Sequence, residues 1–502
     1  MQMSFRIGID IGTTSTKAVL YDGFLGVRDT EARTYPTIRT EEGMAEQDPE
    51  SIFSAVVEVL HSMLDRNDVI RDQISSVSFS SAMHSLLLIS AEGIPLSSVY
   101  TWADNRSNTT LERISNEKDL HWIYERTGTP VHSMSPLSKL MWLKEERSGL
   151  LAEAERIVGI KEFITYRLTG EWKIDYSLAS ATGLFNLESL NWDQDILQFV
   201  GVPRDAFSEP VDTDYVFKQI DKETYDIAGL PMSTQLVIGA SDGCLANLGL
   251  NAVGQNEVAM TIGTSGALRM VSDHIVLDPK ARTFCYYLAK DKWVIGGAVN
   301  NGGNAFEWIA NTFSMDYEKL NKLAGEVEPG ADGLLFYPYL NGERAPLWDA
   351  SVNAHFIGID VMHTTGHFVR SLMEGVLFNL AEVLHILETF GGKSNCIKVT
   401  GGFLHSQLWK QMTADIFGRP ITLSEQFESS CLGAVLVGEL DNTELLETLE
   451  AVEGKVFPDE KTARVYSESF ALYQALSGPL RDMHQIRNSF RKNRNKQKEF
   501  PS

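Results

Sequence analysis

The stretch Ile7-Gly8-Ile9-Asp10-Ile11-Gly12-Thr13-Thr14-Ser15-Thr16-Lys17 organises the rest of the chain. Apolar residues alternate with small or polar ones up to Ile11, which predicts a β-strand that ends in a glycine turn and continues as a second strand. A glycine lets backbone N–H groups approach an anion, and threonine hydroxyls add donors. The Asp10 carboxylate would repel a phosphate bound at this turn unless a cation lay between the two groups. The stretch therefore predicts a magnesium–nucleotide site. An ordinary hairpin with a surface aspartate explains this stretch alone equally well.

The same pattern returns half a chain length later, at Val258-Ala259-Met260-Thr261-Ile262-Gly263-Thr264-Ser265-Gly266-Ala267-Leu268. An apolar strand again runs into Gly-Thr-Ser and a second apolar strand follows. Two related turns predict two similar domains that serve one nucleotide. Thr261 stands where Asp10 stands, so only the first turn carries a carboxylate for a metal.

The bulk composition excludes several classes of protein. A net charge of −23 argues against a nucleic-acid-binding face. No apolar run approaches the roughly 20 residues that span a bilayer. A strand is expected almost at the start of the sequence, and this predicts that there is no signal peptide. The four cysteines lie far apart and show no Cys-x-x-Cys spacing. This predicts a reduced, cytoplasmic protein with no disulfide framework, zinc site or membrane contact.

The order of predicted elements indicates the fold. Strands at 16–21 and 26–35 follow the first strand, then a helix at 52–64 and a strand at 74–79. Strand, strand, strand, helix, strand is the order of the ribonuclease-H-like fold. The length, 502 residues, suits two such domains, predicted at 1–248 and 249–486. Residues 487–498 are basic and lack periodicity, which predicts a frayed end within a polar tail, 487–502.

Polar clusters after the strand at 74–79 suit a polyhydroxylated ligand. Met83 and His84 follow that strand, and Trp102, Asp104 and Arg106 lie within five positions of one another. An aromatic face contacts C–H groups, and charged groups bind hydroxyls. Taken alone, His84 is better explained as a buried, hydrogen-bonded histidine and Arg106 as a surface ion pair.

The strand at 235–241 is expected to deliver Asp242 onto a loop between two glycines. An aspartate in that position is often only a turn residue. Facing Asp10, it could instead accept a proton from a substrate hydroxyl during phosphoryl transfer. Asp175, Ser177 and Ser180 read as a polar loop before Gly183.

Nearly the whole chain resembles the FGGY family of carbohydrate kinases, which share the actin and Hsp70-like ATPase architecture. Residues 9–14 resemble the first phosphate motif, 261–266 the second and 401–409 the adenosine motif, while 134–146 and 358–374 resemble the two family signatures. The resemblance implies an α/β fold of two ribonuclease-H-like domains with an interdomain cleft, ATP and magnesium as cofactors, and a cytoplasmic enzyme. The residues that it implies for the nucleotide are Gly12, Thr13, Thr14, Lys17, Gly263, Thr264, Ser265, Asn301, Gly401, Gly402 and Ser406.

The resemblance also implies roles around the acceptor. Asp242 stands where the family has its catalytic base, and Asp10 and Asp242 are the residues expected near magnesium. Met83, His84, Trp102, Asp104, Arg106 and Asp242 stand where related kinases bind sugar.

Phe403 and Ser85 make the chain resemble the gluconate branch of the family more than the xylulose or glycerol branches. The expected reaction is therefore phosphorylation of a sugar acid, D-gluconate, by ATP to 6-phospho-D-gluconate, with Arg106 and His84 as candidate readers of the carboxylate. The alternatives are a kinase of a neutral pentulose or polyol, such as D-xylulose or glycerol, and an ATP-dependent interaction protein of the actin or Hsp70 kind. A glycosidase would leave both phosphate turns unexplained. The sequence leaves the oligomeric state open, with a homodimer among the options.

Overall fold

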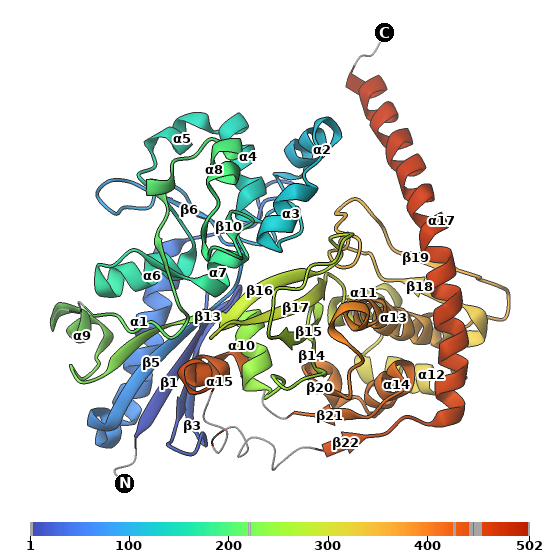
Figure 1. The fold of residues 1–502 in the computed structure, drawn as a ribbon. Helices are drawn as coiled ribbons and strands as arrows, with labels where there is room; N and C mark the ends of the chain where they lie inside the picture. Colours follow the sequence, from blue (N-terminus) through green and yellow to red (C-terminus); the bar gives the residue numbers. More distant parts are fainter. Residues whose placement is uncertain are drawn as a thin grey trace. The chain divides into compact units, whose positions relative to one another are not determined.

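The structure is a computed structural model that describes residues 4–218, 220, 222–424, 428–440, 445 and 454–499. The chain divides into two compact units (Figure 1). The first comprises residues 1–255, 271–295 and 428–452, and the second comprises 256–270, 296–427 and 453–502. Each unit thus combines segments that are distant in sequence. The boundaries expected at 248 and 486 do not include this interleaving, and they stay a prediction.

A five-stranded sheet forms the core of the first unit, in the order β13-β5-β1-β2-β3. β1 (Phe5–Ile11) is antiparallel to β2 (Ser15–Tyr21), which is antiparallel to β3 (Val27–Thr34). On the other side, β5 (Ile74–Ser81) is parallel to β1, and β13 (Gln235–Ser241) is parallel to β5. This order confirms the ribonuclease-H-like fold for the first unit.

Helix α1 (Pro49–Arg66) packs on β2 and β3. Asp48 caps it by accepting a hydrogen bond from the Ser51 N–H at 3.1 Å, and Pro49 occupies the first turn. Each apolar side chain that the helix buries contributes about 1.5–3 kcal/mol. The buried face includes Ile52, Val56, Val59, Leu60 and Met63.

Two short helices from distant parts of the chain also pack in the first unit. α15 (Ser429–Leu436) lies against β1 and β5, and α10 (Asp242–Gly249) lies against α15. A Cβ on Gly8 would come within 2.1 Å of the Cys431 carbonyl oxygen, so only glycine permits this contact.

A second apolar core of the first unit lies between residues 86 and 207 and includes Leu140, Ile123 and Trp192. Leu86 and Tyr100, which lie beside the loops that carry the candidate sugar-binding residues, belong to this core. The remaining elements of the unit are α2 (Asn108–Glu117), α3 (His121–Thr127), α4 (Pro136–Glu146), α5 (Ser148–Glu153), α6 (Ile160–Thr169), α7 (Tyr176–Ser180), α8 (Gln194–Val200), α9 (Lys222–Ala228), β4 (Glu46–Gln47), β6 (Leu87–Ile89), β7 (Val99–Tyr100), β8 (Arg156–Val158), β9 (Lys173–Asp175), β10 (Phe185–Asn186), β11 (Asn191–Trp192), β12 (Glu209–Val211) and β16 (Phe284–Ala289).

The sheet of the second unit repeats the first, in the order β17-β15-β14-β20-β21-β22. β14 (Glu257–Ile262) is antiparallel to β15 (Gly266–Ser272) and parallel to β20 (Cys396–Thr400). This confirms the prediction of a duplicated strand–turn–strand unit. The other strands are β17 (Lys292–Val299), β18 (Leu335–Tyr337), β19 (His355–Ile357), β21 (Ile421–Leu423) and β22 (Gly454–Val456).

The longest buried helix of the second unit is α13 (Thr365–Gly391), as the apolar stripe over 366–390 predicts. The helices α11 (Gly303–Phe313), α12 (Tyr317–Gly325) and α14 (Gln407–Phe417) also belong to this unit.

Helix α17 (Glu460–Glu499) is the last element of the chain (Figure 1). Tyr473 on this helix is buried, and its carbonyl oxygen accepts a hydrogen bond from the Tyr337 hydroxyl at 2.6 Å. The backbone is helical through Glu499, so the expectation of a frayed segment at 487–498 is wrong. Lysine, arginine and glutamine have high helix propensity, and a helix can therefore continue without an apolar stripe.

Two expectations from composition can be compared with the structure. None of the helices in the described ranges combines the length and the apolar character that crossing a membrane requires. No disulfide joins any of the four cysteines, as predicted from their spacing.

Candidate active site

The first phosphate turn connects β1 to β2. The Gly12 N–H donates to the Ser15 carbonyl at 3.0 Å, which closes the turn. The Tyr35 hydroxyl donates to the Gly12 carbonyl at 2.6 Å and fixes the turn from outside. Thr14 is exposed and Thr13 is partly exposed, so both side chains can reach a ligand.

Asp10 lies at the end of β1, directly before this turn. Its Oδ1 accepts a hydrogen bond from the Ser80 hydroxyl at 2.7 Å. Burial raises the pKa of the Asp10 carboxyl, and hydrogen bonds from Ser80 and Ser430 oppose the rise. Lys17 stands opposite Asp10 in the β1–β2 register, but its ammonium pairs with Glu428 at 2.8 Å. The expected contact of Lys17 with the nucleotide stays a prediction.

His84 lies in a strained loop after β5. Its φ of +66° is in the left-handed region, which a side chain other than glycine adopts at a cost. The buried ring approaches the Ala181 carbonyl through Nδ1 at 2.7 Å; because a carbonyl only accepts, Nδ1 carries the proton. Met83, its neighbour, is partly buried against the 86–207 core. The explanation of His84 as a buried, hydrogen-bonded histidine is compatible with this geometry.

A buried lysine supports the His84 loop. Lys139 on α4 is 1% exposed, and its ammonium donates to the carbonyl oxygens of His84, at 3.3 Å, and Met134. Burial lowers the pKa of Lys139 to about 7, against the field of Asp104. No motif marks Lys139, and its one signal in the sequence is a lysine inside a run of apolar helix residues.

Asp104 and Arg106 are engaged with each other. The Arg106 guanidinium contacts the carboxylates of Asp104 at 2.6 Å, Glu46 at 2.5 Å and Glu41 at 3.0 Å. It also lies over the Trp142 ring, 4.8 Å from the centroid. Burial disfavours the charge of Arg106, but hydrogen bonds with Asp104 and Glu46 raise its pKa. This ion pair is largely buried, rather than at the surface.

Trp102 connects this stretch to the phosphate turn. Its indole Nε1 donates to the Thr13 hydroxyl at 2.9 Å. Met83 and Trp102 line the same small cavity as Gly12 and Thr13. The structure thus brings part of the expected sugar stretch next to the first phosphate turn.

Asp242 is the first residue of α10, directly after β13. The sequence predicts a loop here, but the helix begins immediately at the strand end. Its Oδ1 accepts a hydrogen bond from the Gly243 N–H at 2.7 Å, and the residue remains partly exposed. A partly exposed carboxylate at a strand end can accept a proton from a ligand hydroxyl.

The second phosphate turn is held by a glycine-rich loop. The Gly263 N–H donates to the Ser265 carbonyl at 2.9 Å, and the Gly263 carbonyl accepts from the Gly303 N–H at 2.7 Å. Gly263 and Thr264 are exposed, and Ser265 is partly exposed. Asn301 is buried and donates to the Gly342 carbonyl at 3.0 Å, so it holds this loop rather than facing solvent.

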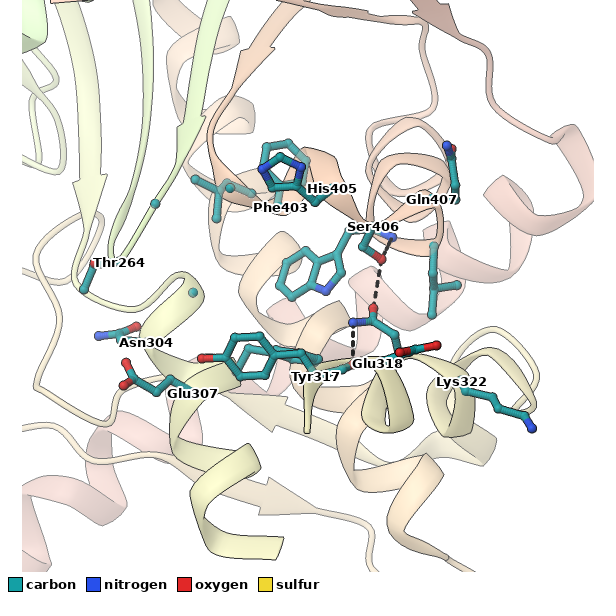
Figure 2. A pocket seen from close by; sticks show the side chains of 18 residues that line it. Thr264, Asn304, Glu307, Tyr317, Glu318, Lys322, Phe403, His405, Ser406 and Gln407 are labelled. Atoms are coloured by element: carbon teal, nitrogen blue, oxygen red, sulfur yellow. Dashed lines mark hydrogen bonds between the residues drawn. The ribbon is translucent and has the colours of Figure 1, made fainter. Parts of the chain in front are cut away.

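A cavity of about 920 Å³ opens beside this turn in the second unit (Figure 2). Thr264 and Asn304 lie at one end of it in Figure 2, and Lys322 and Gln407 lie at the other. Its aromatic side chains suit a flat, apolar ligand such as a nucleobase. They are Phe306, Tyr317, Phe403 and Trp409.

Seven residues of the expected adenosine motif line this cavity, and two of them, Gly402 and Ser406, are among the residues expected to bind the nucleotide. Gly402 is exposed at its rim, and Ser406 caps α14 while donating to the Asn321 amide oxygen at 2.8 Å. Gly401 does not line it, but its φ of +122° and a prospective Cβ only 2.1 Å from the Ile262 carbonyl require glycine.

The part of the cavity wall that the sequence does not mark comes from α11 and α12. No short motif marks these positions, and the available signal was only the Asp316 cap that begins α12. The missed polar residues are Asn304, Glu307, Glu318, Asn321 and Lys322.

Two domain patterns of a known protein family match this chain. The pattern of the N-terminal domain of the FGGY family of carbohydrate kinases matches residues 5–249, and that of the C-terminal domain matches residues 258–440. Both phosphate turns and the adenosine motif fall within these ranges.

Individual proteins resemble the chain over nearly its full length. A gluconokinase of Bacillus subtilis (strain 168) is 42% identical over 500 residues, covering 96% of this chain and 97% of that protein. The crystal structure of gluconate kinase from Lactobacillus acidophilus aligns with a TM-score of 0.90 and 35% identity, covering 95% of this chain and 98% of that one. A ligand-bound xylulose kinase from Lactobacillus acidophilus aligns with a TM-score of 0.91 and 35% identity, covering 96% and 99%.

Proposed function

Because this chain belongs to the FGGY family of carbohydrate kinases, we propose that it transfers the γ-phosphoryl group of ATP to the terminal hydroxyl of D-gluconate. The products are 6-phospho-D-gluconate and ADP. The observation that carries the choice of gluconate is the 42% identity to a gluconokinase over almost the whole of both chains. The likeness to a solved gluconate kinase supports the same choice.

A neutral acceptor is the second candidate. The xylulose kinase structure from Lactobacillus acidophilus shares 35% identity, the same as the gluconate kinase structure. Coupled ADP release over a panel of aldonic acids, pentuloses and polyols separates the two. We expect the highest kcat/KM for D-gluconate, and a higher value for D-xylulose or glycerol would replace the acceptor while leaving the kinase assignment intact.

Membership in the family implies the use of ATP. We propose that the adenine base occupies the 920 Å³ cavity, where aromatic side chains supply an apolar surface. The backbone N–H groups and hydroxyls of Thr264 and Ser265 are proposed to bind phosphate oxygens. Gly12, Thr13 and Thr14 are proposed to do the same in the first unit, since both turns present small residues at a strand end.

Magnesium is the proposed metal, with Asp10 and Asp242 as the protein residues near it. Asp10 has the chemistry for this role, because its carboxylate lies at the phosphate turn while the neighbouring Lys17 pairs with Glu428. Magnesium usually takes one or two protein carboxylates, with phosphate and water completing its shell. The ion would neutralise charge that develops on the transferred phosphoryl group.

Asp242 is the proposed general base. As the acceptor hydroxyl oxygen bonds to the γ-phosphorus, its proton passes to the Asp242 carboxylate and the bond to the ADP oxygen breaks. Phosphoryl transfer depends mainly on how the reacting groups are positioned, so the orientation of this carboxylate matters more than its basicity.

The acceptor is proposed to bind near Met83, His84 and Trp102. Trp102 supplies an indole surface and is linked to the turn through Thr13. Asp104 and Arg106 support this stretch through their buried ion pair.

A further inference from the structure

A buried ion pair lies directly behind the end of β13. Lys161 on α6 has a side chain 2% exposed, and Asp175 before α7 has one 0% exposed. The Lys161 ammonium contacts the Asp175 Oδ2 at 2.7 Å and donates to the carbonyl oxygen of Ala240 at 3.1 Å. Asp175 is itself held, because its Oδ1 accepts from the Leu178 N–H at 2.8 Å. The carbonyl two residues before Asp242 is therefore tied to a buried charge pair.

A second tether holds the next residue. The hydroxyls of Ser177 and Ser241 are 2.8 Å apart, and the Ser241 N–H donates to the Ser177 hydroxyl at 3.3 Å. Ser177 lies on α7, which Asp175 caps. One short segment, 175–177, thus acts on both residues that precede Asp242.

The β13 strand needs these tethers because its own pairing is interrupted. Its register with β5 shifts between Val237 and Ala240, where Gly239 adopts a φ of +68°. A Cβ on Gly239 would lie 1.8 Å from the Phe79 carbonyl oxygen, so the irregularity is built into the sheet. A bulge re-aims the residues that follow it and weakens the ladder that would otherwise fix them.

We propose that Lys161, Asp175 and Ser177 are positioning residues that fix the backbone of Ala240 and Ser241 and thereby aim Asp242 at the acceptor hydroxyl. The proposal rests on the proposed role of Asp242 as base. A buried ion pair adds little net stability relative to a well-packed neutral pair, so stability alone is a weak reason for placing one here. Misplacing a reacting group by about 1 Å can cost on the order of 10²-fold in rate.

The tethers can be removed with little damage to the fold. Ser177→Ala deletes one hydroxyl. Lys161→Met combined with Asp175→Asn removes both charges together, because either change alone would leave a buried charge unpaired, and the asparagine oxygen can still cap α7. Thr165→Val is the matched control: it deletes a buried hydroxyl of α6 that bonds only within its own helix, to the Lys161 carbonyl at 2.9 Å and the Glu162 carbonyl at 3.2 Å.

The measurements are kcat, KM for gluconate, KM for ATP and Tm of each full-length variant. We expect kcat to fall at least tenfold in Ser177→Ala and in the charge-pair variant, with KM for ATP within twofold and Thr165→Val unchanged in kcat. Ser241→Ala should lose less of kcat than Ser177→Ala, because its backbone N–H still donates to the Ser177 hydroxyl, and the serine double variant should lose little more than Ser177→Ala alone.

Two outcomes overturn the positioning role: kcat within twofold of the unsubstituted chain in both tether variants, or losses of kcat that Thr165→Val reproduces at equal Tm. The Asp242→Asn variant distinguishes a failure of the positioning role from a failure of the proposed function. An inactive Asp242→Asn beside fully active tether variants rejects only the positioning role. Full activity in Asp242→Asn rejects the base assignment, and with it the proposal.

Discussion

The indole of Trp102 and the hydroxyl of Thr13 are joined by a hydrogen bond of 2.9 Å, in which Nε1 donates. Thr13 lies in the first phosphate turn and Trp102 in the stretch proposed to bind the acceptor. A neutral hydrogen bond of this kind contributes only about 0.5–1.5 kcal/mol to stability. Here the hydrogen bond matters more for positioning than for stability, because phosphoryl transfer requires the acceptor and the phosphate to be held close together.

Trp102→Phe should therefore weaken the binding of both substrates, gluconate and ATP. The phenyl ring keeps an aromatic surface but cannot donate to Thr13, and we expect the KM values for gluconate and ATP to rise together by about twofold to tenfold. Trp192→Phe is the control, since Trp192 loses an equivalent bond, to the Ser208 carbonyl at 2.8 Å. A rise in KM for gluconate alone would show that the link to Thr13 is unimportant.

Asp242→Asn should abolish most phosphorylation. An amide cannot accept the hydroxyl proton, and loss of a general base costs about 10²–10⁴ in rate. ATP binding, measured calorimetrically, should be nearly intact. Asp332→Asn, which neutralises an exposed carboxylate that pairs with His367, serves as the charge control. Turnover near the level of the unsubstituted chain would contradict the role of Asp242.

Asp10→Ala should change the response to magnesium. Without this carboxylate, we expect lower kcat and a higher magnesium concentration for half-maximal rate, because Thr261 at the equivalent place of the second turn carries no charge. Chelation of the metal should stop turnover of the unsubstituted chain. The metal role of Asp10 would be rejected by an unchanged magnesium titration in the variant.

The sequence predicted local features well and distant partners poorly. Both strand–turn–strand units follow from alternation around Gly12 and Gly263, which neighbouring residues determine. The pairing of Lys17 with Glu428 could not be predicted, because it depends on α15, which arrives at β1 from near the other end of the chain. The interleaving of segments between the two units escaped prediction for the same reason.

The candidate site shows the same division. Gly402 and Ser406 were identifiable because they belong to a short motif. Tyr317 and Asn321 line the same cavity from α12 but carry no motif, and only the fold brings them there. Lys161 and Ala240 likewise meet only in three dimensions.

Glu343 should make stability depend on pH. Burial raises the pKa of this carboxyl to about 7, although the N–H groups of Asn300 and Arg344 donate to it. Its folded-state pKa thus exceeds the unfolded value of about 4.5. The corresponding stability is fully present below about pH 4.5 and is lost as the pH rises through about 7, by up to about 3 kcal/mol.

Glu343→Gln should flatten this slope. The Glu343 Oε2 accepts from the amides of Asn301, at 3.4 Å, and Asn379, at 3.0 Å, while the Oδ1 atoms of both asparagines are buried without a hydrogen bond. If the Asn379 amide turns over, its oxygen can accept from the new glutamine amide, while Asn301 keeps its bond to the Gly342 carbonyl. Melting temperatures from pH 5 to 8 test this, and parallel slopes in both proteins would contradict it. Glu388→Gln, at a carboxyl paired with Arg419, is the control.

Arg106→Ala tests how the acceptor's carboxylate is recognised. The resemblance to the family makes Arg106 a candidate for binding that group, a role that stays a prediction. In the structure its guanidinium already contacts Glu41, Glu46 and Asp104, so the local cluster carries net negative charge. We therefore expect the substitution to lower Tm and to raise the KM values for gluconate and for a neutral pentulose by similar factors, because the stretch that carries Trp102 loses its support.

Arg126→Ala is the matched control for this experiment. Arg126 also pairs with two carboxylates, Asp193 and Asp195, and lies over an aromatic ring, that of Trp122 at 5.5 Å. Its loss should lower Tm without changing either KM. A rise in KM confined to gluconate in Arg106→Ala would reverse our expectation. A charged hydrogen bond is worth about 1.5–3 kcal/mol, so direct recognition of the carboxylate predicts a selective increase of roughly tenfold or more.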